Sequence, residues 1–250
     1  PWVVVLDFKS MYPSIMISNN ICSTTLVKDD NEDETHSVSP TTNTRYISKE
    51  ERLGLVPQLL DGLMQSRDSH KAALAKANEE GDEEEAFLQD QLQYAVKILM
   101  NSFYGVFASN FYRFTHPSLG ASITEWARHN IKSIISKVED EGHSVVYSDT
   151  DSIFVRAPVD EDSPKNRPTD SEDLGKWEEA MSSSMEFGES LAERFTKEGA
   201  ELEFETALSS FFSHGAKKRY VGRVVWPREE MLIRGYEVRR TDSFQILSDT

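Results

Sequence analysis

The sequence contains a single cysteine, Cys22, so no internal disulfide can form. Its six histidines and this cysteine do not show the close spacing that is typical of a zinc site. A chain without disulfides or zinc ligands is typical of a reducing compartment. We therefore expect Cys22 to be a small buried residue and the protein to be intracellular, in the cytoplasm or nucleoid if its source is prokaryotic.

Long apolar runs are also missing. Near the start the longest one extends only from Val3 to Leu6, whereas a membrane-spanning helix needs about 20 apolar residues. The chain starts at Pro1, inside a predicted strand, without a methionine or the features of a targeting peptide. The sequence therefore predicts no membrane association and indicates an excised piece of a longer protein.

Positive charge is scarce, with 27 basic against 43 acidic residues and a net charge of -16. This balance argues against a polyanionic partner, because lysine and arginine drive phosphate binding. The distribution changes that interpretation, since residues 214–240 hold eight basic and only three acidic side chains. Much of the acid lies in short runs, which we expect to be solvated loops or helix faces. These runs are 29–34, 79–85, 160–162 and 170–173.

What is present is a globular composition, with 38% hydrophobic residues in 250, enough for one or two domains with a real core. Apolar spacing predicts a strand over 2–6, two short strands on either side of the sequence SDTDS at 148–152, and a surface loop or weak hairpin over 28–49. Helices are expected over about 57–80, 84–104, 119–139 and 177–198. Strands separated by whole helical blocks indicate an α+β fold, with a mostly antiparallel sheet packed on helices and a projecting αα-hairpin.

Three aspartates are placed where strands are expected to end. Asp149 and Asp151 are two residues apart at the tip of a predicted hairpin, and Asp7 closes the first strand. Mg²⁺ is typically held by a few carboxylates together with substrate phosphates, and two such ions can activate a hydroxyl and stabilise a leaving oxygen. The pattern Asp-x-Asp also occurs in turns for purely local reasons, so a structural role stays open for this feature alone.

The predicted αα-hairpin carries cations on both helices. Arg67 and Lys71 are spaced to lie on one face of its first helix, and Lys97, Asn101 and Tyr104 on one face of its second. Such a pair of helices could clamp a triphosphate, because arginine makes bidentate contacts and lysine acts as a point charge. The alternative is ordinary surface charge beside a core tyrosine.

A third feature is the basic cluster near the C-terminal end of the chain. Three basic residues are adjacent there, and aromatic residues alternate with further charge: Lys217, Lys218, Arg219, Tyr220, Arg223 and Trp226. A segment of this kind could follow a phosphate backbone. A solvated strand end is the alternative interpretation.

Four segments together resemble a known family. DFKSMYPSI at 7–15, KILMNSFYG at 97–105, YSDTDS at 147–152 and KKRY at 217–220 are similar, in order and spacing, to motifs A, B and C and the primer-contacting element of family B DNA polymerases. The surroundings of the second segment, NSFYGVFASNFYRF, resemble archaeal members, and RGYEVRRTDS at 234–243 looks like the family's entry into the thumb.

This resemblance implies a catalytic centre of aspartates. Asp7 and Asp151 would ligate two Mg²⁺ ions, with Mn²⁺ as a substitute, and Phe8 would offer its backbone carbonyl to one ion. Asp149 would be a more loosely involved acidic neighbour. The implied activity is that of a DNA-directed DNA polymerase core, which transfers a deoxynucleotide from a dNTP to a primer 3′-hydroxyl by two-metal-ion catalysis and releases pyrophosphate.

The resemblance also implies a binding site for the incoming dNTP. Ser10 and Met11 would approach the triphosphate through backbone amides, and the ring of Tyr12 would lie beneath the sugar, where it leaves no space for a 2′-hydroxyl. The remaining contacts would come from the helical hairpin, four with the triphosphate as the hairpin closes and two with the nascent base pair. These residues are Arg67, Lys71, Lys97 and Asn101, then Tyr104 and Gly105, with Lys97 also counted as catalytic.

Primer-template DNA is the other implied partner. The resemblance assigns it to Lys217, Lys218, Arg219 and Tyr220, which would read duplex geometry rather than base sequence. Glu205, in LEFE before the basic segment, is a further candidate for an acidic role. A sliding clamp would be bound through regions outside this chain.

The implied domain order places the palm on both sides of the fingers. The first part of the palm would be 1–53, the fingers 54–108, the second part of the palm 109–233, and the start of the thumb 234–250. Ser148 and Met11 depart from the family's usual glycine and leucine, and both are compact enough to leave a metal site plausible.

Two other functions fit part of the sequence. A nucleotide-sugar glycosyltransferase also uses an Asp-x-Asp turn to hold a diphosphate through a metal, but that reading leaves KILMNSFYG and KKRY unexplained. A degenerate polymerase relative that serves only as a DNA-binding or assembly module would have broken metal ligands, whereas Asp7, Asp149 and Asp151 are all intact.

Overall fold

The computed structural model describes residues 1–27, 34–109, 111–113, 115–197 and 201–235. The chain divides into two compact units. Residues 1–9 and 131–250 form the first, which we call the sheet unit, and residues 10–130 form the second, which we call the helical unit. Each unit is described by itself.

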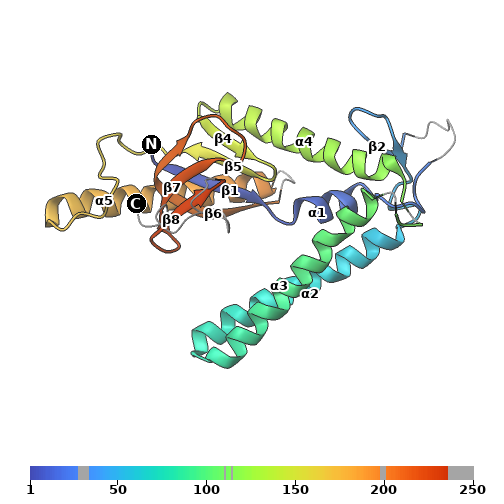
Figure 1. The fold of residues 1–250 in the computed structure, drawn as a ribbon, viewed down its shortest axis with the longest axis horizontal. Helices are drawn as coiled ribbons and strands as arrows, with labels where there is room; N and C mark the ends of the chain where they lie inside the picture. Colours follow the sequence, from blue (N-terminus) through green and yellow to red (C-terminus); the bar gives the residue numbers. More distant parts are fainter. Residues whose placement is uncertain (28–33, 110, 114, 198–200, 236–250) are drawn as a thin grey trace, which may run out of the picture. The chain divides into compact units, whose positions relative to one another are not determined.

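The sheet unit is built on a six-stranded sheet in which every pairing is antiparallel, as the sequence predicted. The strand order is β4-β5-β1-β6-β7-β8 (Figure 1). The strands are β1 Val3–Phe8, β4 Val145–Asp149, β5 Ser152–Arg156, β6 Leu202–Ser213, β7 Tyr220–Trp226 and β8 Glu230–Arg234.

Strand β1 lies inside the sheet, between β5 and β6, which explains its sequence. A strand covered on both faces is expected to be a continuous run of β-branched and other apolar residues, and Val3 to Leu6 are all buried. In the register with β5, Val5 is opposite Phe154 and Asp7 is opposite Ser152. The predicted strand therefore ends with an aspartate next to the start of β5.

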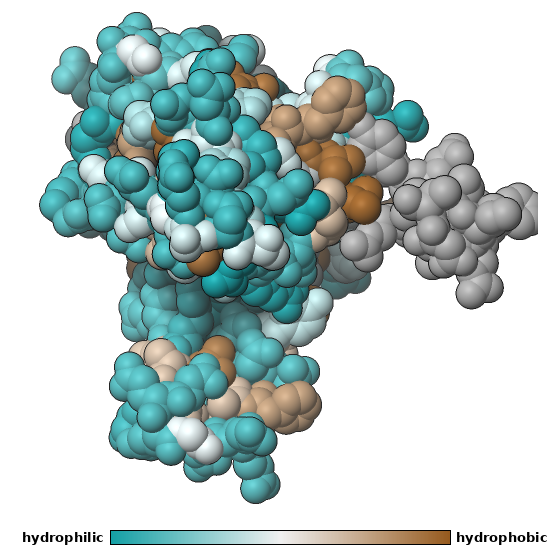
Figure 2. Space-filling view, turned by 90° about the vertical axis from the view of Figure 1, so that its left-hand side faces the viewer, coloured by the Kyte–Doolittle hydropathy of each residue, from teal (hydrophilic) through white to brown (hydrophobic). Residues whose placement is uncertain are grey.

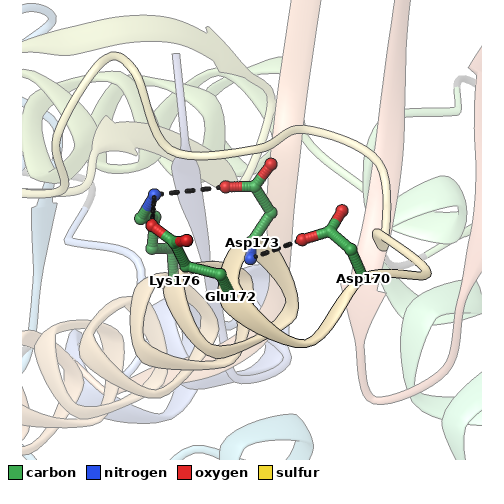
Figure 3. A network of polar contacts seen from close by, with 4 residues as sticks. All are labelled: Asp170, Glu172, Asp173 and Lys176. Carbon is green, nitrogen blue, oxygen red and sulfur yellow. Dashed lines mark hydrogen bonds and ion pairs between the residues drawn. The ribbon is translucent and has the colours of Figure 1, made fainter.

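Helix α5, Ser171–Lys197, covers one face of the sheet (Figure 1). The rings of Trp2 and Trp177 lie 6.4 Å apart at this contact. The helix starts six residues before the predicted Trp177, because Asp170 caps it by accepting a hydrogen bond from the Asp173 backbone N–H at 2.9 Å. Figure 3 shows this cap beside Lys176, which pairs with Glu172 and Asp173.

The opposite face of the sheet carries an aromatic cluster. Alternate residues of a strand point to opposite faces, so Val3 and Val5 lie away from Trp2, in a core with Phe154, Leu208, Tyr220 and Val224. The side chains of Tyr147 and Phe211 pack against this core. Asp7 follows in the same alternation and therefore lies on the aromatic face, at the end of β1.

The helical unit contains α1 Met11–Ser18, α2 Leu55–Glu80, α3 Glu83–Phe107 and the first part of α4 Pro117–Asp140, which continues into the sheet unit. Helices α2 and α3 pack against each other, and the two predicted helices with a short link are confirmed. Gly81, at φ 72°, ends α2, and Asp82 caps α3 by accepting from the Glu85 N–H at 3.0 Å. Helix α1 was not predicted from the sequence.

The segment after residue 33 is a small hairpin of β2 Ser37–Val38 and β3 Arg45–Tyr46, anchored to α4. Glu125 of α4 is only 6% exposed. Its carboxylate accepts hydrogen bonds from the Ser39 hydroxyl and from the Thr42 backbone N–H at 3.1 Å. Burial by itself raises the pKa of Glu125, but these hydrogen bonds outweigh it, and the net pKa lies below the ordinary value. The hairpin is therefore held by an ionised buried carboxylate.

The remaining sequence expectations concern burial. Cys22 is buried, as predicted. The acidic run over 79–85 is exposed at all but its last residue. On the face of the molecule drawn in Figure 2, most of the surface belongs to hydrophilic residues. Among the helices of the described ranges, none is long and apolar enough to cross a membrane.

Candidate functional site

Two of the three aspartates lie around one turn, and the third lies beside it. Asp149 ends β4, Ser152 begins β5, and Thr150 between them adopts a left-handed conformation with φ 48°. The Phe8 N–H donates to the Asp151 carbonyl oxygen at 2.9 Å, which ties the end of β1 to this turn. We call residues 149–151 the aspartate turn. The structure thus brings Asp7 next to Asp151 along the backbone, as the sequence predicted.

The chemistry of these side chains fits a hard divalent cation. No group of three or more His, Cys, Asp or Glu side chains in the described ranges is arranged to hold a metal by itself. Mg²⁺ needs no such group, because one or two carboxylates plus substrate phosphates complete its shell. Asp7 and Asp151 supply two carboxylates at adjoining strand ends, and Phe8 supplies a nearby backbone carbonyl.

Asp149 has a different environment. Its carboxylate lies 3.5 Å from the Lys218 ammonium and accepts a hydrogen bond from the Thr150 hydroxyl at 3.2 Å. Its side chain is 22% exposed, against 69% for that of Lys218. Asp149 is therefore engaged by a cation from a distant part of the sequence.

The basic cluster forms the turn between β6 and β7. Lys217, Lys218 and Arg219 are exposed, and their charges can reach a ligand. Tyr220 is different, since it is 9% exposed and its ring packs in the aromatic core. Burial raises the pKa of Tyr220, and Arg234, which hydrogen-bonds its hydroxyl, partly opposes this rise. We call residues 214–219 the basic turn.

Several predicted dNTP-binding residues meet in the helical unit. Ser10, with φ 47°, precedes α1, and its hydroxyl accepts a hydrogen bond from the Arg67 guanidinium of α2 at 3.3 Å. The same guanidinium donates to the Gln93 side chain of α3 at 3.3 Å. The rings of Tyr12 and Tyr104 lie 4.5 Å apart. The start of α1 is thus linked to both long helices.

The other predicted dNTP-binding residues occupy nearby turns of the same helices. Lys71 is half-buried one turn after Arg67 on α2, and Lys97 and Asn101 are exposed on α3. Gly105 is exposed on the last turns of α3, and Met11 is buried at the start of α1. These residues and the aspartates belong to different compact units, which the chain joins at the Lys9–Ser10 and Asn130–Ile131 peptide bonds.

Glu205 occupies an irregular position in β6. Val5 is opposite Thr206 and Leu6 is opposite Phe204, so Glu205 has no partner residue on β1. Bulges of this kind redirect a side chain and are frequent next to active sites. Glu205 lines a cavity of about 410 Å³, together with Tyr220, Arg228 and Arg234 among others.

Sequence reasoning missed Tyr147 and Thr150, which contact the basic turn. The Lys218 N–H donates to the Tyr147 hydroxyl at 2.8 Å, and the Lys218 ammonium donates to the Thr150 hydroxyl at 3.2 Å. Tyr147 precedes Asp149 by two residues in a strand, so both lie on one face. That alternation was the available signal, but the partner, 71 residues away, was not visible from it.

Comparison with known proteins decides the family. Residues 1–167 match the sequence model of DNA polymerase family B. This chain belongs to DNA polymerase family B. The match covers three of the four segments that carry the resemblance, and the basic turn lies beyond it.

Curated relatives of the family B chain come from all three domains of life. DNA polymerase 1 of Pyrococcus abyssi is 29% identical over 99% of this chain, and DNA polymerase II of Escherichia coli is 29% identical over 96%. The DNA polymerase delta catalytic subunit of Bos taurus is 29% identical over 99% of the chain. The chain spans 29%, 29% and 22% of the lengths of these relatives.

The fold also has a solved counterpart. The family B DNA polymerase from the hyperthermophilic archaeon Pyrobaculum calidifontis superposes with a TM-score of 0.67, over 94% of this chain and 27% of the other, at 24% identity. The α+β fold with an antiparallel sheet is therefore that of a family B polymerase segment.

Proposed function

We propose that this chain is the catalytic core of a DNA-directed DNA polymerase, which adds deoxynucleotides from dNTPs to a primer 3′-hydroxyl and releases pyrophosphate. The observation that carries the proposal is the placement of Asp7 and Asp151 at adjoining strand ends, in a chain that belongs to family B. The chain spans less than a third of its curated relatives, so the rest of such a protein would contribute to the whole activity.

The proposed domain order follows from the same family. Residues 1–53 and 109–233 would be the palm, 54–108 the fingers and 234–250 the start of the thumb. The packed pair α2 and α3 supports the assignment of the fingers. Residues 236–250, which hold most of the proposed thumb segment, lie outside the described ranges.

Asp7 and Asp151, with the Phe8 carbonyl, would hold Mg²⁺ or Mn²⁺. When bound, two such ions would acidify the primer hydroxyl and neutralise charge on the triphosphate. The two carboxylates would fix where the primer end and the α-phosphate meet, because both are set by the antiparallel register of β1 and β5. Asp149, paired with Lys218, would act on this site indirectly.

The start of α1 would receive the triphosphate. The first backbone N–H groups of a helix have no partner within the helix and attract anions, so those after Ser10 suit phosphate oxygens. Arg67 already reaches this point through its contact with Ser10. Tyr12 would exclude ribonucleotides, and Tyr104, in contact with its ring, would pack with Gly105 on the new base pair. The triphosphate would also be bound by Lys71, Lys97 and Asn101.

Primer-template DNA would be held by the basic turn. The exposed Lys217, Lys218 and Arg219 can neutralise phosphates, and binding of this kind weakens as salt rises. Tyr220 would contribute by supporting the turn from the core, since its ring is buried there. A sliding clamp would bind through regions outside this chain.

Templated primer extension with Mg²⁺ and the four dNTPs tests the proposal. We expect wild type to extend the primer and the Asp151→Ala variant to be slower by about 10³-fold or more, as is typical when a group that stabilises charge is removed. The matched control is Asp160→Ala, which removes an exposed carboxylate from a loop of the same unit. Equal extension by wild type and Asp151→Ala, or none by wild type, would contradict the proposal.

A further inference from the structure

The aspartate turn and the basic turn are tied together by side chains. The backbone N–H of Lys218 donates to the Tyr147 hydroxyl at 2.8 Å, and its ammonium donates to the Thr150 hydroxyl at 3.2 Å. The ammonium also lies 3.5 Å from the Asp149 carboxylate. The strands next to these turns, β4 and β7, are not neighbours in the sheet order. These two strands therefore share no ladder hydrogen bonds that could hold the turns together. The contacts of Tyr147, Asp149 and Thr150 with Lys218 connect the turns instead.

Both turns have an unusual backbone. Thr150 and Lys218 adopt left-handed conformations, with φ 48° and 61°. Residues other than glycine seldom adopt this conformation, especially β-branched ones such as threonine, and they keep it where surrounding contacts fix it. Gly235, with φ 70°, lies against the basic turn, since any Cβ there would overlap the Lys218 carbonyl oxygen. Contacts with the surrounding structure therefore keep both turns in backbone conformations that their own residues do not favour.

Tyr147 is a rigid support for this arrangement. Its ring packs on Phe154, Phe211 and Tyr220, with centroids 5.3, 5.8 and 5.2 Å away. Phe154 is opposite Val5 in the sheet, two residues before Asp7. The hydroxyl of Tyr147 therefore stands on the same packed core that sets the position of Asp7.

We propose that Tyr147 is a positioning residue, whose hydroxyl holds the basic turn at a fixed place relative to Asp7 and Asp151. This inference rests on the proposed function, in which the basic turn grips the primer end and the two aspartates form the reaction centre. The hydroxyl touches neither DNA nor nucleotide in this scheme. It acts through the backbone of Lys218.

The Lys218–Asp149 pair is a second and weaker tie. The Lys218 side chain is 69% exposed, and ion pairs at such positions are weak and screened by salt. When DNA binds, a primer phosphate could replace the Asp149 carboxylate as the partner of the Lys218 ammonium. The Tyr147 bond involves a neutral hydroxyl and a backbone N–H, so it persists when the lysine turns to DNA. Tyr147 therefore carries the positioning, and Lys218 is free to exchange partners.

The Tyr147→Phe variant removes the hydroxyl and keeps the ring. In the DNA-free protein we expect the Lys218 amide to exchange with deuterium about fivefold faster, the loss typical of one neutral hydrogen bond. The change should be the same at low and high salt. Tyr46→Phe is the matched control, because it removes a hydroxyl that donates to Ser122 in the helical unit. It should leave the Lys218 amide unchanged.

Single-turnover incorporation of one dNTP measures the consequence for catalysis. We expect Tyr147→Phe to lower the rate constant by about tenfold, because the basic turn then no longer holds the primer end in line with the two aspartates. The Kd for primer-template should change by less than about twofold, because the charges of the turn stay available to the DNA. A merely structural defect would lower the fraction of active protein and leave the rate constant of the remainder intact. Lys218→Ala should show the opposite pattern and raise the Kd.

Each result has one meaning. Unchanged exchange of the Lys218 amide in Tyr147→Phe would overturn the positioning contact. Faster exchange with an unchanged rate constant would overturn its role in catalysis. If wild type incorporates no nucleotide, the proposed function fails and the catalytic role of Tyr147 fails with it, whereas the exchange result still decides whether the contact holds the turn.

Discussion

Two glycines on helix α5 should respond in opposite directions to the same substitution. Gly188 is buried, and a Cβ placed there would lie 2.5 and 2.6 Å from the Cδ2 and Cε2 atoms of Phe204. At Gly175, on the same helix, a Cβ would meet nothing within 4 Å. We expect Gly188→Ala to destabilise the sheet unit and Gly175→Ala to stabilise it.

The magnitudes follow from helix propensity and packing. Alanine in place of glycine within a helix gains about 1 kcal/mol, which applies at both positions. At Gly188 the new methyl would lie about 1 to 1.5 Å closer to Phe204 than the normal carbon–carbon distance of about 3.5 to 4.0 Å. Phe204 cannot turn away freely, because it stacks on Trp226 at 4.8 Å and 7°. Overpacking of this kind costs about 1 to 3 kcal/mol, so the net loss at Gly188 is about 1 kcal/mol and the two variants differ by about 2 kcal/mol.

Urea unfolding followed by tryptophan fluorescence measures this difference. Trp2, Trp177 and Trp226 belong to the sheet unit, so a Trp126→Phe background removes the signal of the helical unit. A Phe204→Leu substitution should relieve most of the loss in Gly188→Ala, because a smaller side chain makes room for the methyl. Wild-type stability in Gly188→Ala, or a loss that Phe204→Leu does not relieve, would refute the reasoning.

Further predictions concern the nucleotide site, DNA and pH. Tyr12→Ala should raise ribonucleotide incorporation far more than it lowers deoxynucleotide incorporation, and unchanged sugar discrimination would remove Tyr12 as the selecting residue. Lys97→Ala should mainly raise the KM for dNTP. Lys218→Ala should mainly weaken DNA binding and reduce its salt dependence. If both variants showed the same defect, the assignment of Lys97 to dNTP and Lys218 to DNA would be wrong. Glu125→Gln should speed amide exchange in the 37–46 hairpin by about tenfold or more, unlike the exposed control Glu139→Gln. Because the pKa of Glu125 is lowered in the folded protein, its carboxylate stabilises the fold above the ordinary carboxyl pKa, and this stabilisation is lost as pH falls through the lowered value. An effect of Glu125→Gln on exchange that persists at low pH would contradict this explanation.

Local patterns in the sequence were sufficient to predict the strands that carry the proposed catalytic centre. The β-branched run before Asp7 and the two short apolar runs around SDTDS are strong local signals. All three are confirmed as strands, and β5 pairs with β1 on one side and with β4 on the other. Helix α1 was missed because it has eight residues and Pro13 within them, too short for a periodic pattern. The start of α5 was placed late because its first turns are polar and only the cap of Asp170 marks them.

Long-range partners were the part that could not be predicted. Nothing near Tyr147 in the sequence indicates the Lys218 amide, and nothing near Glu125 indicates Ser39, because both contacts depend on how distant segments fold together. The bulge at Glu205 likewise depends on its register with β1. The roles of the site residues in binding and catalysis stay predictions, which the proposed experiments test.

The central position of β1 has a consequence for synthesis of the protein. The ribosome makes this strand before both of its partners, which begin about 150 and about 200 residues later, at Ser152 and Leu202. At about 5 to 20 residues per second, a ribosome needs about 10 to 40 s to deliver the second partner. During that interval the apolar segment from Trp2 to Leu6 has no partner strands, while the helical unit, which follows it in the sequence, is synthesised. Cotranslational folding of this family B chain therefore favours chaperone protection of β1 until its partners are made.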